Sequence, residues 1–153
     1  MKNDEFVFAR VAYLADTNAE GNVYFARFFE WQGMAREEFF RSNVPDCMKI
    51  MQSGIRIITK NAWMVFQHEG RLFDDVEIRI QTSNLKPMSL ELVFTFRNKA
   101  TGEILGRGGE KLAFTNAEGK LIPVPTSVME NAKRFLTARA PELQEIDSNR
   151  TLR

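Results

Sequence analysis

The chain has 153 residues, 44% of them hydrophobic, which is enough for one domain with a buried core. Its 21 basic and 20 acidic residues nearly cancel, which argues against binding to nucleic acid or a membrane through charge. A single cysteine and a single histidine exclude an internal disulfide and multi-cysteine or multi-histidine metal sites, so we expect no metal.

The first predicted element is a strand. The stretch from Phe6 to Leu14 is apolar apart from Arg10, a pattern typical of a central strand. It is too short for the apolar core of a signal peptide or a membrane helix, so we expect a soluble, cytoplasmic protein. Residues 15–22 are rich in turn formers and predict a loop.

Residues 24–41, YFARFFEWQGMAREEFFR, predict a long amphipathic helix. At about 100° per residue, one broad arc collects the aromatic side chains and Ala35. The aromatic members are Tyr24, Phe25, Phe28, Phe29, Trp31, Phe39 and Phe40. Gln32 and Arg36 fall inside the same arc, one turn apart. Because burying an unpaired arginine is costly, Arg36 is predicted either to pair with a buried acid or to line a polar pocket.

The rest of the chain predicts strands and a second helix. Pro45 ends the long helix, and a short turn or helix follows it. Alternating or apolar runs predict strands over residues 55–69, 76–81, 89–96 and 104–114. Gly106, Gly108 and Gly109 in the last strand indicate a bulge or a close backbone approach.

The C-terminal part predicts a helix and a polar tail. Ser127 and Glu130 have the spacing of a capping box, which predicts a helix to about Leu136. Residues 141–153 form the predicted tail, so the domain spans residues 1–140. The order of elements predicts an α+β fold, in which an antiparallel sheet of about five strands wraps around the long helix. One sheet face covers the wide aromatic arc only in part, so we expect a homodimer or tetramer.

Residues 16–24, DTNAEGNVY, resemble the D-T-D-x-x-G-x-V-Y signature of hot-dog-fold thioesterases of the 4-hydroxybenzoyl-CoA thioesterase type. In that family a helix ending in E-x-A-R-x-E follows, and Ala35, Arg36 and Glu38 match it. The resemblance is close over the first quarter of the chain, and the later strand order is compatible with it. It implies a hot-dog fold and hydrolysis of a thioester without an organic cofactor.

Three positions depart from the family pattern. Asn18 stands where the family usually has its catalytic aspartate. Gly33 stands at a second acidic position, at the centre of the helix, and Glu20 replaces a glycine that is common in the loop. With Asn18 and the segment FFEWQG, the chain is similar to the thioesterases of enediyne polyketide biosynthesis. Those enzymes release a polyene from the carrier domain of a polyketide synthase, and their proposed site uses an asparagine and a helix arginine. The resemblance therefore implies catalytic roles for Asn18 and Arg36.

The resemblance also implies roles for neighbouring groups. The backbone N–H of Tyr24 or Phe25, at the start of the helix, would face the thioester oxygen. Phe28 and Phe29 would be candidates for the wall of an acyl channel. The substrate would be a phosphopantetheine-linked acyl group, carried by a carrier domain or by CoA.

Each assignment has a simpler alternative. Asn18 could be a turn residue, since asparagine suits turns, and Glu20 could be a solvated loop carboxylate or a base. Arg36 could be a structural ion paired with Glu20 or with an acid of a second subunit. Gln32 could fill a polar niche at the dimer contact or support catalysis. For the whole protein, the alternatives are an acyl-CoA thioesterase and a non-catalytic acyl-binding hot-dog protein.

Overall fold

The computed structural model describes residues 4–137, and the structural statements below concern this range. One antiparallel sheet forms the frame, with strands in the order β1-β3-β4-β5-β2. The strands are β1 (Phe6–Val11), β2 (Arg56–Phe66), β3 (Asp75–Lys86), β4 (Ser89–Asn98) and β5 (Ile104–Thr115). A sixth strand, β6 (Leu121–Ile122), pairs with the end of β5. The fold is a hot-dog fold, with one short strand more than the predicted five.

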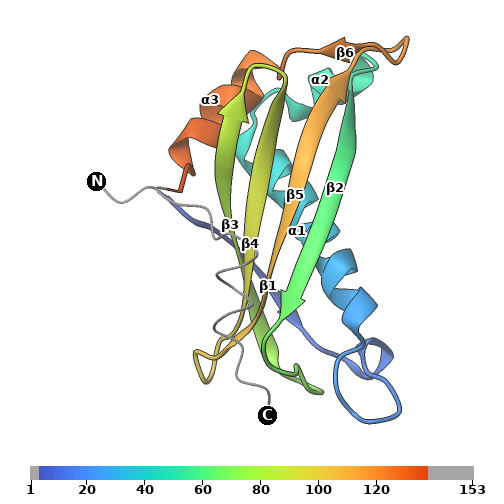
Figure 1. The fold of residues 1–153 in the computed structure, drawn as a ribbon, viewed down its shortest axis with the longest axis vertical. Helices are drawn as coiled ribbons and strands as arrows, with labels where there is room; N and C mark the ends of the chain where they lie inside the picture. The colour runs from blue at the N-terminus through green and yellow to red at the C-terminus, as the bar shows by residue number, and fades with distance from the viewer. Residues whose placement is uncertain (1–3, 138–153) are drawn as a thin grey trace.

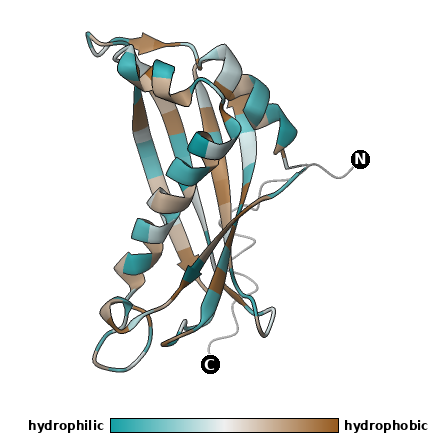
Figure 2. Cartoon of the chain, turned by 180° about the vertical axis from the view of Figure 1, so that it is seen from behind, coloured by the Kyte–Doolittle hydropathy of each residue, from teal (hydrophilic) through white to brown (hydrophobic). Residues whose placement is uncertain are grey.

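The helices gather on one face of this sheet. Helix α1 (Phe25–Asn43) runs behind the strands in Figure 1 and in front of them in Figure 2. The short helix α2 (Cys47–Gln52) follows the predicted break at Pro45. Helix α3 (Thr126–Arg134) packs beside β3, near the end of the molecule at which α2 lies (Figure 1). Within the described residues, no helix has the length and apolar character needed to cross a membrane.

The core lies between α1 and the sheet. In β4 every second residue is buried, as expected of a strand with one face on a helix. Phe28 on α1 packs against the rings of Phe66 and Phe96, with centroids 5.4 Å and 5.3 Å away. The aromatic arc divides, because Tyr24, Phe25 and Phe29 remain exposed while Phe28, Trp31, Phe39 and Phe40 are buried.

The glycines of β5 mark close approaches on both faces of the sheet. A Cβ at Gly108 would collide with the Gln32 side chain of α1. A Cβ at Gly109 would collide with the indole of Trp63, which belongs to the neighbouring strand β2. These contacts confirm the prediction of a close approach. The register also shifts between Phe96 and Arg97, opposite the start of β5.

Three details of the predicted elements are wrong. The first strand lies at an edge of the sheet and not at its centre, since β1 ends the strand order and pairs only with β3 among the described strands. The first strand also ends at Val11 and not at Leu14, because the chain turns into a 3₁₀ helix at Leu14–Asp16, where the Tyr13 N–H before the helix donates to the Asp16 carboxylate at 2.9 Å. The C-terminal helix begins at Thr126 after Pro125 with no side-chain cap, so Ser127 does not form the predicted capping box. The predicted tail, residues 141–153, lies outside the described residues.

Candidate active site

The loop before α1 is a tight turn built around Asn18. The Asn18 N–H donates to the Asn22 carbonyl oxygen at 2.9 Å, and the Gly21 N–H donates to the Asn18 carbonyl oxygen at 3.0 Å. The Asn18 side-chain oxygen accepts the Glu20 N–H at 3.0 Å, which is an Asx turn. The amide nitrogen of Asn18 has no partner within the described residues. Asn18 is therefore a turn residue through its oxygen and keeps a free donor.

The two backbone donors expected at the start of α1 differ. The Tyr24 N–H donates to the Asp16 carbonyl oxygen at 2.8 Å, so it is already used within the chain. The Phe25 N–H has no hydrogen-bond partner in the part of the chain that the structure describes. Because it belongs to the first turn of a helix, this N–H is one of the groups that intrahelical bonding leaves free. Of the two, only Phe25 offers a free donor.

Arg36 occupies the middle of α1 and is held by two strands. Its Nη1 donates to the Thr59 hydroxyl oxygen of β2 at 2.8 Å and to Oε2 of Glu110 on β5 at 3.0 Å. The Glu110 side chain is only 6% exposed, whereas that of Arg36 is 20% exposed. The predicted pairing with Glu20 is wrong, because Glu20 lies in the exposed loop before α1, and Glu110 supplies the acid instead.

The other side of the Arg36 guanidinium remains available. Within residues 4–137, Nη2 has no hydrogen-bond partner, and Nε is buried without one. One nitrogen is thus anchored to the protein while the opposite edge of the planar group is unpaired. A guanidinium held in this way can donate to a developing oxyanion without first breaking a bond.

Gln32, one turn before Arg36, joins the same cluster. It is fully buried, and its amide nitrogen lies 3.3 Å from Oε1 of Glu110 and 3.4 Å from the carbonyl oxygen of Gly109. Its own side-chain oxygen has no partner within the described residues. We call Gln32, Arg36, Thr59 and Glu110 the mid-helix cluster. Gln32 therefore contacts the sheet of its own chain and fills no niche between subunits.

Glu110 is not among the residues predicted from the sequence, although the sequence carries a signal for it. Residues Gly108, Glu110, Leu112 and Phe114 alternate along β5 and share the face that meets α1. An acidic residue on the same face of a strand as two apolar residues is expected to be buried with them and to have a partner for its charge. Gly109, between the first two, belongs to the opposite face and obscures the alternation.

An apolar cavity of about 720 Å³ lies beside the C-terminal half of α1, and Arg36 is among its lining residues. Other parts of the wall come from Phe40, Cys47, Met51, Ile57 and Phe114. Neither of the aromatic residues expected in an acyl channel lines it. Phe28 is packed in the core at 2% exposure and Phe29 is exposed at 37%, so their assignment to a channel wall stays a prediction.

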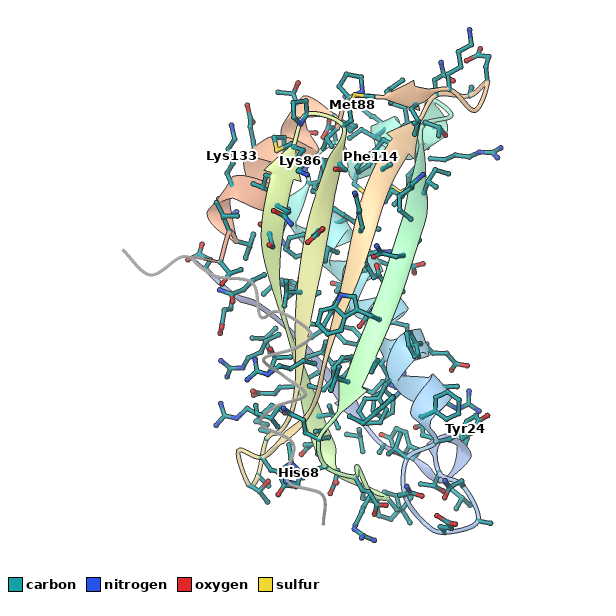
Figure 3. All side chains as sticks on the ribbon, viewed as in Figure 1. Tyr24, His68, Lys86, Met88, Phe114 and Lys133 are labelled. Atoms are coloured by element: carbon teal, nitrogen blue, oxygen red, sulfur yellow. The ribbon has the colours of Figure 1, made fainter. Side chains whose placement is uncertain are left out.

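The loop and the cavity lie toward opposite ends of the molecule. Figure 3 labels Tyr24 near one end of the long axis and Phe114, at the cavity, near the other. Phe25 and Arg36 are separated by about 17 Å along the helix, from 1.5 Å of rise per residue. Arg36 bonds to the two strands and does not reach back toward Asn18. The two candidate catalytic side chains of one chain therefore do not meet.

Charged residues line the cavity near Arg36. Hydrogen bonds from Arg41 and then Ser42 lower the pKa of Glu38 from 4.5 to about 2. The Arg41–Glu38 pair is also short, at 2.6 Å, and stands at the exposed end of α1.

Groups of three or more side chains that could hold a metal ion do not occur among the described residues.

Comparison with known proteins defines the class. The chain belongs to the thioesterase-like superfamily, whose family model matches residues 13–132. A provisionally named esterase of Aquifex aeolicus (strain VF5) is 27% identical over 131 residues, which are 84% of this chain and 98% of that protein. With the hot-dog fold, this membership makes the chain a thioester hydrolase that acts on acyl-CoA or similar thioesters.

Two solved structures are similar over most of the chain. The dynemicin thioesterase, known from crystal structures that concern polyene binding, has 28% identity and a TM-score of 0.83, covering 89% of this chain and all of that one. A 1,4-dihydroxy-2-naphthoyl-CoA thioesterase from Synechocystis has 20% identity and a TM-score of 0.78, covering 85% of this chain and 96% of that one. The second likeness concerns the fold alone.

Proposed function

We propose that this hydrolase releases a long acyl or polyene chain from the phosphopantetheine arm of a polyketide synthase carrier domain. One observation carries the proposal, namely an arginine that is anchored at Nη1, open at Nη2 and part of the wall of an apolar cavity. The cavity volume of about 720 Å³ suits a single extended chain. The similarity to the dynemicin thioesterase supports a polyene as that chain.

The chemistry is hydrolysis of a thioester. Water adds to the carbonyl carbon, forming a C–O bond and an oxyanion, and the C–S bond then breaks. The products are a carboxylic acid and the free phosphopantetheine thiol, which receives a proton from the attacking water. Donors that meet the oxyanion lower the barrier, and one well-placed donor contributes about 3 kcal/mol. We assign this role to Arg36 Nη2, the Phe25 N–H and the amide nitrogen of Asn18.

These donors come together only if two copies of the chain share a site. The separation of about 17 Å between Phe25 and Arg36 along α1 keeps the loop at Asn18 away from Arg36 of the same chain. We propose that the loop of one copy faces the mid-helix cluster of another and that the thin phosphopantetheine arm enters between them. The exposed rings of Tyr24 and Phe25 beside the loop support such an interface, because it would bury them.

The free edge of the sheet favours a homodimer or a tetramer. Strand β2 ends the sheet, and no other strand of the described chain pairs with its outer side. Ile57 and Ile58 on this strand are partly exposed. An unpaired apolar edge is a template for association with another chain. A solution mass equal to one chain at micromolar concentration would contradict this part of the proposal.

The test compares carriers with the same acyl chain. The polyene or a saturated acyl group of equal length is loaded on a carrier domain and on CoA, and kcat/KM is measured for each of the four substrates. We expect the carrier-bound polyene to be the best substrate. A higher kcat/KM with the CoA substrates would show that the protein is an acyl-CoA thioesterase. Binding of the substrates without any hydrolysis would favour the non-catalytic acyl-binding alternative. Arg36→Gln serves as the inactive control.

A further inference from the structure

Glu110 lies outside the sequence motif and has no part in the proposed chemistry. Glu110 is a buried carboxylate on the face of β5 that meets α1, and its two oxygens contact different side chains. We infer that Glu110 is a positioning residue for hydrolysis, which holds the Arg36 guanidinium so that Nη2 faces the cavity. The inference rests on the proposed role of Arg36.

The hydrogen bonds on Arg36 restrict its orientation. Thr59 and Glu110 both accept from the same nitrogen, Nη1, at 2.8 Å and 3.0 Å. They belong to neighbouring strands, since β2 and β5 pair along their length. Two acceptors on two strands anchor one corner of the planar guanidinium. The other terminal nitrogen, Nη2, has no hydrogen-bond partner among the described residues and is left free to bind a group outside the chain.

The carboxylate is itself held in place. The Gln32 amide nitrogen lies 3.3 Å from Oε1 of Glu110 and 3.4 Å from the Gly109 carbonyl oxygen. A reversed amide would place the Gln32 oxygen against two acceptors, so only one orientation is favourable. Gly108 leaves the space that Gln32 occupies, because a Cβ there would collide with it. A continuous series of hydrogen bonds thus links Gly109, Gln32, Glu110 and Arg36.

Stability alone does not account for this arrangement. An ion pair in the interior costs desolvation of both charges, and apolar residues of similar size often serve as well or better. The inward neighbour Leu112 on β5 is apolar and fully buried. The cluster also leaves the Gln32 oxygen and Arg36 Nε without partners, which is a further cost. A precise orientation for Arg36 offsets these costs if Arg36 acts on substrate.

The experiment measures Glu110→Gln, Glu110→Asp, Arg36→Gln and the double variant Arg36→Gln/Glu110→Gln. We expect Glu110→Gln to lower kcat at least about tenfold with KM nearly unchanged, and Glu110→Asp to recover part of the loss. Because Glu110 acts through Arg36, adding Glu110→Gln to Arg36→Gln should cause no further loss of kcat. Glu77→Gln is the control, since it removes a carboxylate that pairs with Arg79 on the other face of the sheet.

Each result decides the inference. Parent-like kcat in folded Glu110→Gln, or losses that multiply in the double variant, would overturn it. If Glu110→Gln does not fold, the double variant, which removes both charges, is compared with Arg36→Gln alone, and a further loss of kcat again overturns it. Parent-like kcat in Arg36→Gln would instead refute the proposed role of Arg36. Loss in Arg36→Gln with none in Glu110→Gln would refute only the positioning role.

Discussion

The loop around Asn18 and the mid-helix cluster hold polar groups by different means. In the loop, contacts between neighbouring residues hold Asn18, and its side-chain oxygen bonds only two residues further on. In the cluster, Arg36 bonds to residues 23 and 74 positions away. The loop therefore depends on local turn chemistry, while the cluster exists only when α1 packs on β2 and β5. A substitution in the loop should therefore lower mainly turnover, whereas a substitution in the cluster should lower both turnover and the stability that comes from packing.

The largest expected effect is that of Arg36→Gln. We expect kcat to fall by about 100-fold, as when an oxyanion donor is removed. Because Glu110 then loses its cation, we also expect a loss of up to about 3 kcal/mol in unfolding free energy. Arg36→Lys, which keeps the charge but loses the planar fork, should stay closer to the parent in stability and still lose most turnover. Steady-state kinetics beside thermal melts check both effects.

One outcome would remove the contrast between the regions. If Arg36→Gln is strongly destabilised and yet as active per folded molecule as the parent, the cluster is purely structural.

The second-largest expected effect comes from overpacking the mid-helix cluster. Gly108→Ala places a methyl group against Gln32 and 3.1 Å from both Met64 Cε and the Trp63 carbonyl oxygen. We expect a loss of about 1–3 kcal/mol from overpacking, read from the urea midpoint, together with lower turnover. Gly33→Ala on α1 is the matched control, since its Cβ meets nothing within 4 Å. That substitution should raise stability by about 0.5–1 kcal/mol. Equal unfolding midpoints for the two variants would show that the approach at Gly108 is not tight.

The third effect tests the loop. Asn18→Ala should lower turnover at least about tenfold while removing one exposed hydrogen bond, so its melting temperature should change little. Asn18→Asp keeps an oxygen that accepts the Glu20 N–H and should melt like the parent. Turnover of Asn18→Ala equal to that of the parent would leave Asn18 as a turn residue only.

The smallest effect concerns the cavity end of α1. The pKa of Glu38 is lowered from 4.5 to about 2, so its pairing stabilises the folded state above pH 4.5 and is lost as the pH falls toward 2. We expect the melting-temperature difference between parent and Glu38→Gln to shrink between pH 5 and pH 2.5. Arg41→Gln should reduce the same pH dependence, because Arg41 is the main cause of the shift. A difference that is constant over this range would contradict the assignment.

The sequence by itself determined the features that depend on nearby residues. The 3.6-residue period of the aromatic side chains predicted α1 to within two residues at each end, and the motif DTNAEGNVY identified the family. Turn-forming residues likewise located the loop at Asn18, and the glycines of β5 indicated its close approaches. Each of these signals lies within one short segment.

Only the tertiary structure decided which distant residues share a site. The sequence showed that Arg36 needed a partner or a pocket, and the fold supplied both, with Glu110 from a strand 74 residues away and the cavity beside α1. It also placed Phe28 in the core and Phe29 at the surface, although both belong to one aromatic arc. The physical reason is that a helical period gives the direction of a side chain, whereas the sheet packed against the helix determines what that side chain meets.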